Sequence, residues 1–235
     1  MKHILMSILV MSVLVLGACQ MDKSGTVDGE ESPENVDPKD TETDDLPEVR
    51  AFQDEFTRGF LQSTEETRPG YYPFLSATGA FEMDFPESGK IAENLYHIKN
   101  KSFEIMKVNV GTETSDILHT IRIQYTGHLE EEIHKETSLG MLHSELEGDL
   151  DFDRIEEGQQ IYHISEFELE KDEDYHEVYG YAAYVFNKQG QGGIEIVYNA
   201  NCLENCAELR ESDKQNMYDW IKSVRFLEEP VENEW

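Results

Sequence analysis

The sequence has few basic residues, three cysteines and no apolar run long enough to cross a bilayer. Only 19 of its 235 residues are Lys or Arg, against 50 Asp or Glu, so the formal net charge is −31. This balance argues against nucleic acid as a partner, because phosphate contacts require basic side chains. It also argues against attraction to anionic lipid headgroups, and it favours cations or basic partners. An acidic composition is also typical of proteins that face a saline or alkaline exterior, and this explanation is favoured over a dedicated basic partner.

Motifs that carry chemistry are also missing from the sequence. No G-x-S-x-G nucleophile motif is present, and paired carboxylates for glycoside hydrolysis cannot be selected among so many acids. The segment Asp149–Asp153 begins like an EF-hand calcium loop, but Arg154 and Gln160 stand where that loop needs glycine and glutamate. The sequence therefore predicts no catalytic residue, no metal site and no cofactor.

Histidine is concentrated in one part of the chain without the spacing of a metal site. A helical zinc pair needs two ligands three or four residues apart, on one face of the helix. No such pair occurs among the six histidines of the middle region, which favours scattered surface positions over a metal cluster. These residues are His119, His128, His134, His143, His163 and His176.

The N-terminus contains a short apolar stretch, Ile4–Leu16, of 13 residues. A transmembrane helix needs roughly 20 apolar residues, whereas the apolar region of a secretory signal needs about 7–15. The stretch ends in Leu16-Gly17-Ala18-Cys19, which resembles the lipobox of bacterial lipoproteins. The resemblance implies a signal peptide over 1–18, cleavage before Cys19 and lipid attached to Cys19. The protein would then be anchored in the cell membrane by lipid, facing the extracytoplasmic side. The alternative is an ordinary secretory signal with a chance cysteine.

Residues 19–50 read as a lipidated cysteine followed by an acidic, disordered linker. Positions 21–50 hold 11 acids and 3 bases, and no aromatic residue occurs between Gln20 and Arg50. Such a segment cannot bury enough apolar surface to offset the entropy lost on ordering. As a flexible coil it would have an r.m.s. span of ~30 Å. The remaining residues, 51–235, are numerous enough for a single domain with its own core.

The predicted domain is α+β, with an antiparallel sheet flanked by helices. A helix is expected over 51–63, where Phe52, Phe56 and Phe60 share one face. Alternating apolar residues and short, turn-rich connections then predict strands joined by hairpins. The predicted strands are 81–86, 102–110, 120–127, 160–169, 177–187 and 192–200, and two further helices are expected over 129–146 and 205–222.

The last predicted helix has its own pattern. Ser212 and Gln215 fit the S-x-x-Q capping box, which marks a helix N-terminus. A buried stripe follows, and SVRFL after it is expected to form a short terminal strand or an extended segment. The stripe consists of Met217, Trp220, Ile221 and Val224.

The order of these elements resembles the Mog1/PsbP-like domain family. The resemblance covers about 75–230 and is carried by FEMDFP as the opening strand, by the hairpins, and by MYDWIKSVRF as the closing helix and strand. It implies an antiparallel sheet flanked by helices and a role in binding or assembly. The family has no shared catalytic residues to transfer to this chain.

Two cysteines remain if Cys19 is lipidated. Cys202 and Cys206 are an even pair outside the cytoplasm, which favours a disulfide between them. Free thiols, or a metal or redox role for the C-x3-C pair, are the alternatives.

The function predicted from the sequence is that of a binding or assembly module at the cell envelope. Tyr71, Tyr72 and Phe74 form an extended aromatic stretch that is a candidate binding surface. The expected partners are the membrane, through the lipid on Cys19, and a protein. An envelope hydrolase with a carboxylate-based site is one alternative, and an extracytoplasmic metal-binding protein that uses His and Asp is another.

Overall fold

The computed structural model describes residues 37–227 apart from residues 40, 113, 128–130, 147–149, 170–176, 191 and 205. The predicted signal peptide, Cys19 and the first part of the linker lie outside the described residues. Within the described ranges, no helix is both long and apolar enough to cross a membrane.

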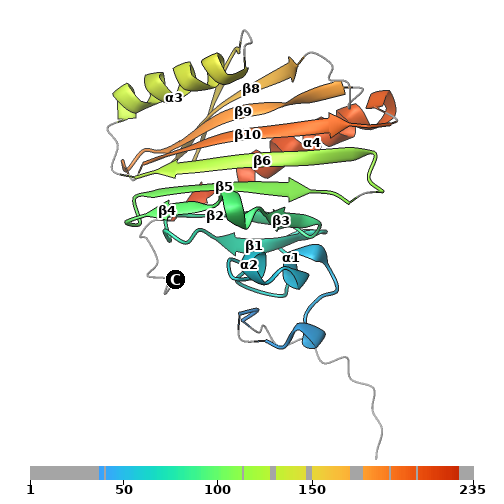
Figure 1. Ribbon diagram of the computed structural model, residues 1–235. Coiled ribbons are helices and arrows are strands. Elements are labelled where there is room, and N and C mark those ends of the chain that lie inside the picture. The colour runs from blue at the N-terminus through green and yellow to red at the C-terminus, as the bar shows by residue number, and fades with distance from the viewer. Residues whose placement is uncertain are drawn as a thin grey trace, which may run out of the picture. The chain divides into compact units, whose positions relative to one another are not determined.

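A large antiparallel sheet forms the centre of the fold (Figure 1). Its strand order is β3-β5-β6-β10-β9-β8-β7, and β4 pairs with β5 beside this path. Most neighbours are also consecutive in the chain, as expected where short loops join hairpins. The strands are β3 (Gly89–Ile91), β4 (His97–Lys99), β5 (Phe103–Val110), β6 (Ile117–Thr126), β7 (Asp153–Glu157), β8 (Gln160–Leu169), β9 (Glu177–Asn187) and β10 (Gly193–Cys202).

A second, three-stranded sheet closes one side of the molecule. It consists of β1 (Tyr71–Leu75), β2 (Phe81–Pro86) and β11 (Arg225–Phe226), in the order β1-β2-β11. The pairing of Phe226 with Phe81 places the end of the domain beside its opening strand. The predicted terminal strand is therefore confirmed, as is the α+β class.

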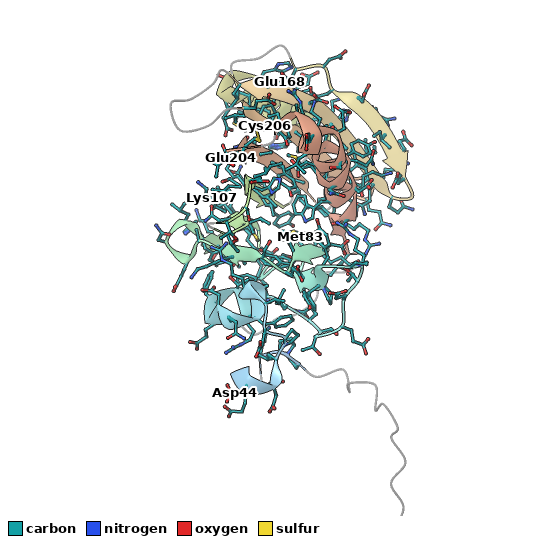
Figure 2. All side chains as sticks on the ribbon, turned by 90° about the vertical axis from the view of Figure 1, so that its right-hand side faces the viewer. Asp44, Met83, Lys107, Glu168, Glu204 and Cys206 are labelled. Carbon is teal, nitrogen blue, oxygen red and sulfur yellow. A yellow bond between two sulfur atoms is a disulfide. The ribbon has the colours of Figure 1, made fainter. Side chains whose placement is uncertain are left out.

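Two long helices cover opposite faces of the large sheet. Helix α3 (Glu131–Leu146) packs on β9 and β10, whereas α4 (Cys206–Ser223) contacts the other face of the same strands and also β2. Figure 1 shows α3 in front of the sheet and α4 behind it. The principal core lies between the two sheets and α4, and it includes Met83 and Cys206, both labelled in Figure 2.

The predicted stripe is confirmed, and α4 has nearly the limits expected over 205–222, but the predicted capping box does not mark its start. Met217, Trp220, Ile221 and Val224 are fully buried. The helix runs without a break from Cys206, so Ser212 lies inside it. The Ser212 hydroxyl donates to the Leu209 carbonyl at 2.9 Å instead of capping a helix start.

The predicted continuous helix over 51–63 is also wrong. The chain forms two single-turn helices, α1 (Arg50–Gln53) and α2 (Glu55–Arg58), separated by Asp54 in an extended conformation. Asp54 caps α2, because its carboxylate accepts a hydrogen bond from the backbone N–H of Thr57 at 2.9 Å. Phe52 and Phe60 are nevertheless fully buried.

Two short 3-10 helices complete the described part of the fold. They are η1 (Thr43–Asp45) and η2 (Glu93–Leu95). Leu46 is buried in the principal core, so the packed structure begins before residue 51.

Candidate functional site

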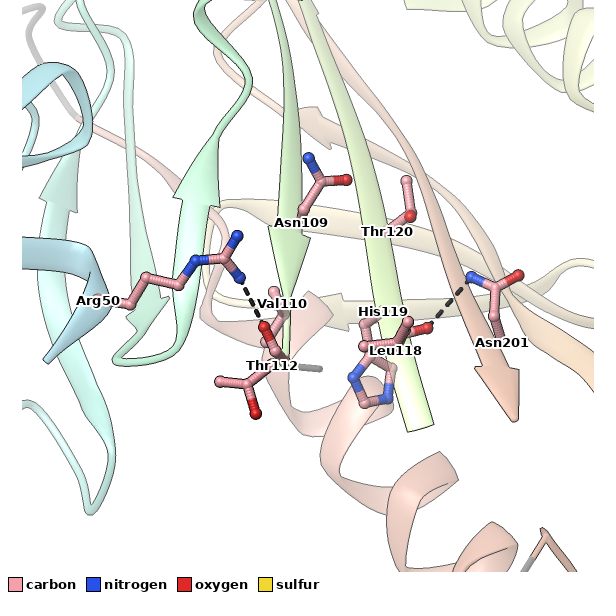
Figure 3. A pocket seen from close by; sticks show the side chains of 9 residues that line it. Arg50, Asn109, Val110, Thr112, Leu118, His119, Thr120 and Asn201 are labelled. Atoms are coloured by element: carbon pink, nitrogen blue, oxygen red, sulfur yellow. Dashed lines mark hydrogen bonds between the residues drawn. The ribbon is translucent and has the colours of Figure 1, made fainter. Parts of the chain in front are cut away.

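An open pocket of about 510 Å³ lies where β5 ends, β6 begins and β10 ends (Figure 3). Side chains from α1 and from these three strands line it, so residues far apart in the sequence meet there. The lining residues are Arg50, Asn109, Val110, Gly111, Thr112, Leu118, His119, Thr120 and Asn201.

Arg50, the first residue of α1, is fixed at one wall of the pocket. Its Nη1 donates to the carbonyl oxygen of Gly111 at 2.6 Å and to that of Ser88 at 3.2 Å. Gly111 has a φ of +103°, which favours glycine, and this conformation turns the chain between β5 and β6. Arg50 therefore joins α1 to two loops and brings a permanent positive charge to the pocket.

Amide and hydroxyl side chains form a polar row across the sheet beside Arg50. Thr120 of β6 lies directly opposite Asn109 of β5 and Asn199 of β10, so all three side chains point to one face. Asn201 donates through Nδ2 to the Leu118 carbonyl at 3.1 Å. The Oδ1 atom of Asn199 is buried and has no hydrogen-bond partner among the described residues. The row thus provides donors together with one unsatisfied acceptor.

His119 connects the pocket with α4 on the other side of the sheet. Its Nε2 lies 2.8 Å from Oδ1 of Asp213, and Oδ2 of Asp213 accepts a hydrogen bond from the Tyr179 hydroxyl at 2.8 Å. Burial of Tyr179, together with its hydrogen bond to Asp213, raises the pKa of this phenol above its usual value. Tyr179 therefore remains a neutral donor that orients Asp213 toward His119.

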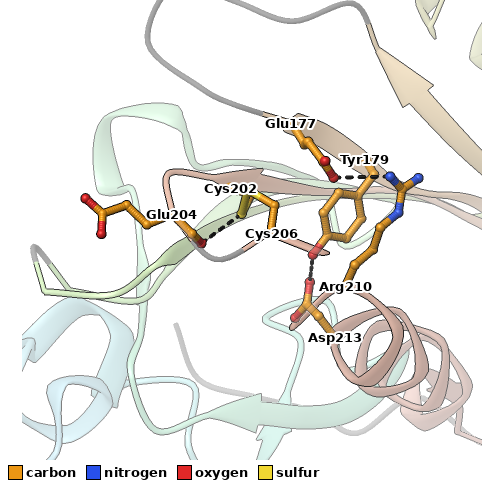
Figure 4. Close-up of a disulfide and its surroundings, with 7 residues drawn as sticks. All are labelled: Glu177, Tyr179, Cys202, Glu204, Cys206, Arg210 and Asp213. Atoms are coloured by element: carbon orange, nitrogen blue, oxygen red, sulfur yellow. Dashed lines mark hydrogen bonds and ion pairs between the residues drawn. A yellow bond between two sulfur atoms is a disulfide. The ribbon is translucent and has the colours of Figure 1, made fainter. Parts of the chain in front are cut away.

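Arg210 covers the buried Tyr179 ring, with its guanidinium 5.2 Å from the ring centroid (Figure 4). It also pairs with Glu177 at 3.1 Å. The cluster around Asp213 is consequently held by both sheet and helix.

The predicted disulfide is present between Cys202 and Cys206, whose Cα atoms are 5.8 Å apart. It joins the last residue of β10 to the first residue of α4 (Figure 4). In the same turn, the backbone N–H of Leu203 donates to the Asp116 carbonyl at 2.8 Å. These bonds fix the β10–α4 turn beside the pocket, next to Asn201.

The electrostatic character of the pocket differs from that of the chain. No carboxylate occurs among the described lining residues, although the chain has 50 acids. One guanidinium, one imidazole, two amides and two hydroxyls provide its polar groups. Such a lining suits an anionic or hydroxyl-bearing group, because charge-assisted hydrogen bonds from a guanidinium favour anions.

Comparison with known proteins assigns the chain to a family. The family model YvcA_Mog1p, described as "Putative lipoprotein YvcA", matches residues 47–225. The chain belongs to the YvcA lipoprotein family. It is 30% identical over 239 residues to "Putative lipoprotein YvcA" of Bacillus subtilis (strain 168), covering 97% of this chain and 98% of that protein. The Mog1-like resemblance of the sequence is thereby confirmed.

Two solved structures are also similar to the chain. One is the crystal structure of the Ran-binding protein Mog1p of Saccharomyces cerevisiae, with 13% identity, a TM-score of 0.43 and coverage of 66% of this chain and 94% of that one. A Mog1 point variant gives 11% identity, a TM-score of 0.42 and coverage of 66% and 95%.

The predicted aromatic binding surface is wrong for this family member. Tyr72 and Phe74 are 5% and 1% exposed, and both rings lie in the principal core. Phe74 stacks on Phe60 at a centroid distance of 5.4 Å. Tyr71 is half-buried beneath the guanidinium of Arg68, 3.5 Å from its ring centroid. The rings are needed to join the small sheet to the core, so they cannot form an exposed patch.

The aspartates of the incomplete EF-hand pattern lie at a different pocket. Asp151 and Asp153 line a cavity of about 390 Å³ with Glu166, Tyr181 and Tyr218. Within the part of the chain that the structure describes, no three His, Cys, Asp or Glu residues are grouped as metal ligands would be. His128 and His176 lie outside the described residues.

Sequence reasoning missed the pocket residues except for His119, which was grouped with scattered surface histidines. Asn109, Asn199 and Asn201 provide the signal that could have located the site. Asparagine is depleted in strands, so two of them within predicted strands and one directly after the second strand indicate a polar requirement on that face.

Proposed function

We propose that this lipoprotein is a binding module of the cell envelope, attached to the membrane by lipid on Cys19 and facing the extracytoplasmic side. The lipobox at residues 16–19 and the membership of a lipoprotein family support the anchor. More than one acyl chain is needed for stable anchoring, because a single chain binds only marginally. The acidic segment of residues 20–36 would then separate the domain from the bilayer.

The module binds a partner that presents an anionic group, and the pocket of Arg50 receives this group. The observation that carries the proposal is the carboxylate-free lining in a chain with a net charge of −31. Arg50 provides the charge, and Asn109, Thr120 and Asn201 provide hydrogen bonds to neighbouring hydroxyl or carbonyl groups. The disulfide and the His119–Asp213 pair hold the walls in place before binding.

Inorganic phosphate is a suitable probe because it carries the proposed chemistry without a defined partner. We expect phosphate to produce saturable shifts in the amide NMR signals of Gly111, Thr112 and Thr120. Arg50→Gln should abolish the shifts, whereas Arg58→Gln should preserve them. Arg58 lies in the neighbouring helix and donates to the Phe52 carbonyl at 3.2 Å, away from the pocket lining.

Unchanged amide spectra at high phosphate would contradict the proposal. Shifts of equal size in the Arg50→Gln variant would contradict it as well, because they would place the anion elsewhere. The dispersion of the remaining amide signals reports whether each variant is folded.

A further inference from the structure

One face of the large sheet is left open beside α3. Helix α3 packs on β9 and β10, and Figure 1 shows β6 and β5 below it with their near side uncovered. Burial alternates strictly along β5, so Ile105 and Lys107 point to this open side while Met106 and Val108 enter the core. Lys99 of β4 points the same way, because its partner across the hairpin is Phe103.

This side of β4, β5 and β6, which we name the acid-free face, has the opposite charge to the rest of the molecule. The one carboxylate in these three strands is Glu104, which is buried on the core side. Lys99, Lys107 and Arg122 lie on the acid-free face, where Lys107 and Arg122 are directly opposite across β5 and β6. Arg122 forms an ion pair with Glu145 of α3 at the border of the face.

Apolar side chains accompany these cations. Leu95, in the connection before β4, is 50% exposed, the largest value among the large hydrophobic residues that the structure describes. Phe103 and Ile105 are half-buried on the acid-free face. Glu93 lies two residues from Leu95 and is the nearest exposed acid in that connection. Basic residues beside exposed apolar residues are typical of surfaces that contact lipid headgroups.

The turn between β4 and β5 holds a third lysine in an unfavourable conformation. Asn100 and Lys101 have φ values of +49° and +52°. Asparagine tolerates this left-handed region, but at the second position glycine is the residue that adopts it without strain. The chain places an exposed, charged side chain there instead, at the corner next to Lys99.

We propose that the acid-free face turns toward the anionic membrane surface in which the protein is anchored. The inference rests on the lipid anchor proposed at Cys19, which keeps the bilayer within reach. The acidic body does not prevent this contact, because charges more than ~8 Å apart are largely screened at physiological salt. Lysines within that distance of anionic headgroups are attracted individually.

The linker is long enough to permit this orientation. Seventeen residues, 20–36, separate Cys19 from the first described residue. As the flexible coil that the sequence predicts, they would have an r.m.s. span of ~25 Å, which would let the domain rotate while it stays near the bilayer. Orientation is then decided by the charge difference between the faces.

The test uses the full, lipidated chain in vesicles of phosphatidylcholine with or without phosphatidylglycerol. A fluorophore is attached at Leu95→Cys, and in a matched control at Asn216→Cys, an exposed position of α4 on the other side of the sheet. A lipid with a nitroxide headgroup serves as quencher. We expect phosphatidylglycerol to increase quenching severalfold at position 95 and not at 216, and high salt to reverse the increase.

The lysines are tested by a triple variant, Lys99→Gln, Lys101→Gln and Lys107→Gln, in the Leu95→Cys chain. Quenching should fall to the level without phosphatidylglycerol, and Lys101→Gly, which removes one charge without strain, should give part of this loss.

Equal quenching at both positions, or no response to the lysine changes, would overturn the proposal. Arg58→Gln, which removes a charge outside both the pocket lining and the acid-free face, should leave quenching unchanged. Protein that does not float with the vesicles would refute the anchor instead.

Discussion

Glu104 shows how a single buried residue joins the two sheets. Its carboxylate accepts hydrogen bonds from the backbone N–H groups of Ala77 and Thr78, at 3.1 and 3.0 Å, and from the Thr78 hydroxyl and the Tyr96 hydroxyl. Residues 77 and 78 belong to the β1–β2 turn, whereas Glu104 is in β5. Besides the packing of its rings, the small sheet is thus attached to the large one through hydrogen bonds to this acid.

Glu104→Gln should destabilise the fold by about 1–3 kcal/mol, because an amide cannot accept from all these donors. Burial raises the pKa of the Glu104 carboxyl above its ordinary value of 4.5, against the opposing effect of its hydrogen-bond donors. The folded chain therefore binds this proton at higher pH than the unfolded chain. The contribution of the Glu104 carboxyl to the free energy of unfolding is fully present below pH 4.5. It is lost as the pH rises through the folded-state pKa.

In the Glu104→Gln variant the side-chain amide does not titrate, so this pH-dependent contribution to stability is absent. We expect the difference in free energy of unfolding between wild type and Glu104→Gln to grow as the pH falls from about 8 to about 5. Urea denaturation at several pH values measures it. A difference that stays constant, or that shrinks toward low pH, would show that the pKa of Glu104 is not raised.

Lys101→Gly should stabilise the domain by about 1 kcal/mol, since glycine adopts the left-handed conformation of this residue without steric cost. Lys101→Ala should bring no such gain, because alanine keeps the Cβ atom that causes the strain. Chemical denaturation of the three proteins makes the comparison. If alanine and glycine stabilised equally, the effect would come from loss of charge rather than from the backbone.

At the scale of the elements, the alternation of hydrophobic and polar residues predicted the long strands but not the short ones. β2, β8 and β9 have the predicted limits, because alternation over six or more residues is a strong signal. β3 and β4 have three residues each, too few to show a period, and β7 (DRIEE) is largely polar because it lies at the edge of the sheet. The helix expected over 51–63 failed because the capping chemistry of Asp54 overrides the spacing of the phenylalanines.

The candidate site depends on contacts that no local pattern reveals. His119 and Asp213 are 94 residues apart, and Arg50 meets the Gly111 carbonyl across 61 residues. Their meeting depends on strand register and on the docking of α1, which are properties of the folded chain. The C-x3-C pair was predictable because its geometry is local.

Trp220 of α4 is the residue through which the helix contacts both sheets. Its ring is fully buried and packs edge-on against Tyr198 of β10 at a centroid distance of 5.2 Å, and its Nε1 donates to the Asp84 carbonyl of β2 at 2.7 Å. Trp220→Ala should cost roughly 3–5 kcal/mol through the cavity it leaves. Trp220→Phe should cost less, because it chiefly removes the hydrogen bond to Asp84.

Tyr218→Ala, a change at a half-buried position of the same helix, is the control for these variants. Thermal or urea unfolding gives the order of stabilities. A loss below about 0.5 kcal/mol for Trp220→Ala would be incompatible with a buried ring, since truncating a core aromatic leaves a cavity.

At the scale of the whole molecule, the distribution of charge is more informative than its sum. The folded part, 51–235, carries 39 acids and 15 bases, yet both the pocket lining and the acid-free face are without carboxylates where they are described. A uniformly acidic surface would serve solubility alone. A face that carries basic side chains and no carboxylate would give the domain a preferred direction relative to an anionic surface, which a net charge cannot do.

The proposed anchoring is the whole-molecule property on which this direction depends, and it would rest on one atom, the sulfur of Cys19. Cys19→Ser removes the thiol that would carry the thioether lipid, so the protein should leave the membrane fraction or accumulate as an unprocessed precursor. Cys202 and Cys206 cannot substitute, because their sulfurs are joined in the disulfide.

Fractionation of cells that express wild type and Cys19→Ser, with the mass of the mature chain, measures both outcomes. Ala18→Ser, which preserves a small residue before the cleavage point, is the matched control and should remain anchored. Normal processing and unchanged membrane association of Cys19→Ser would show that something other than the lipobox cysteine holds the protein at the bilayer.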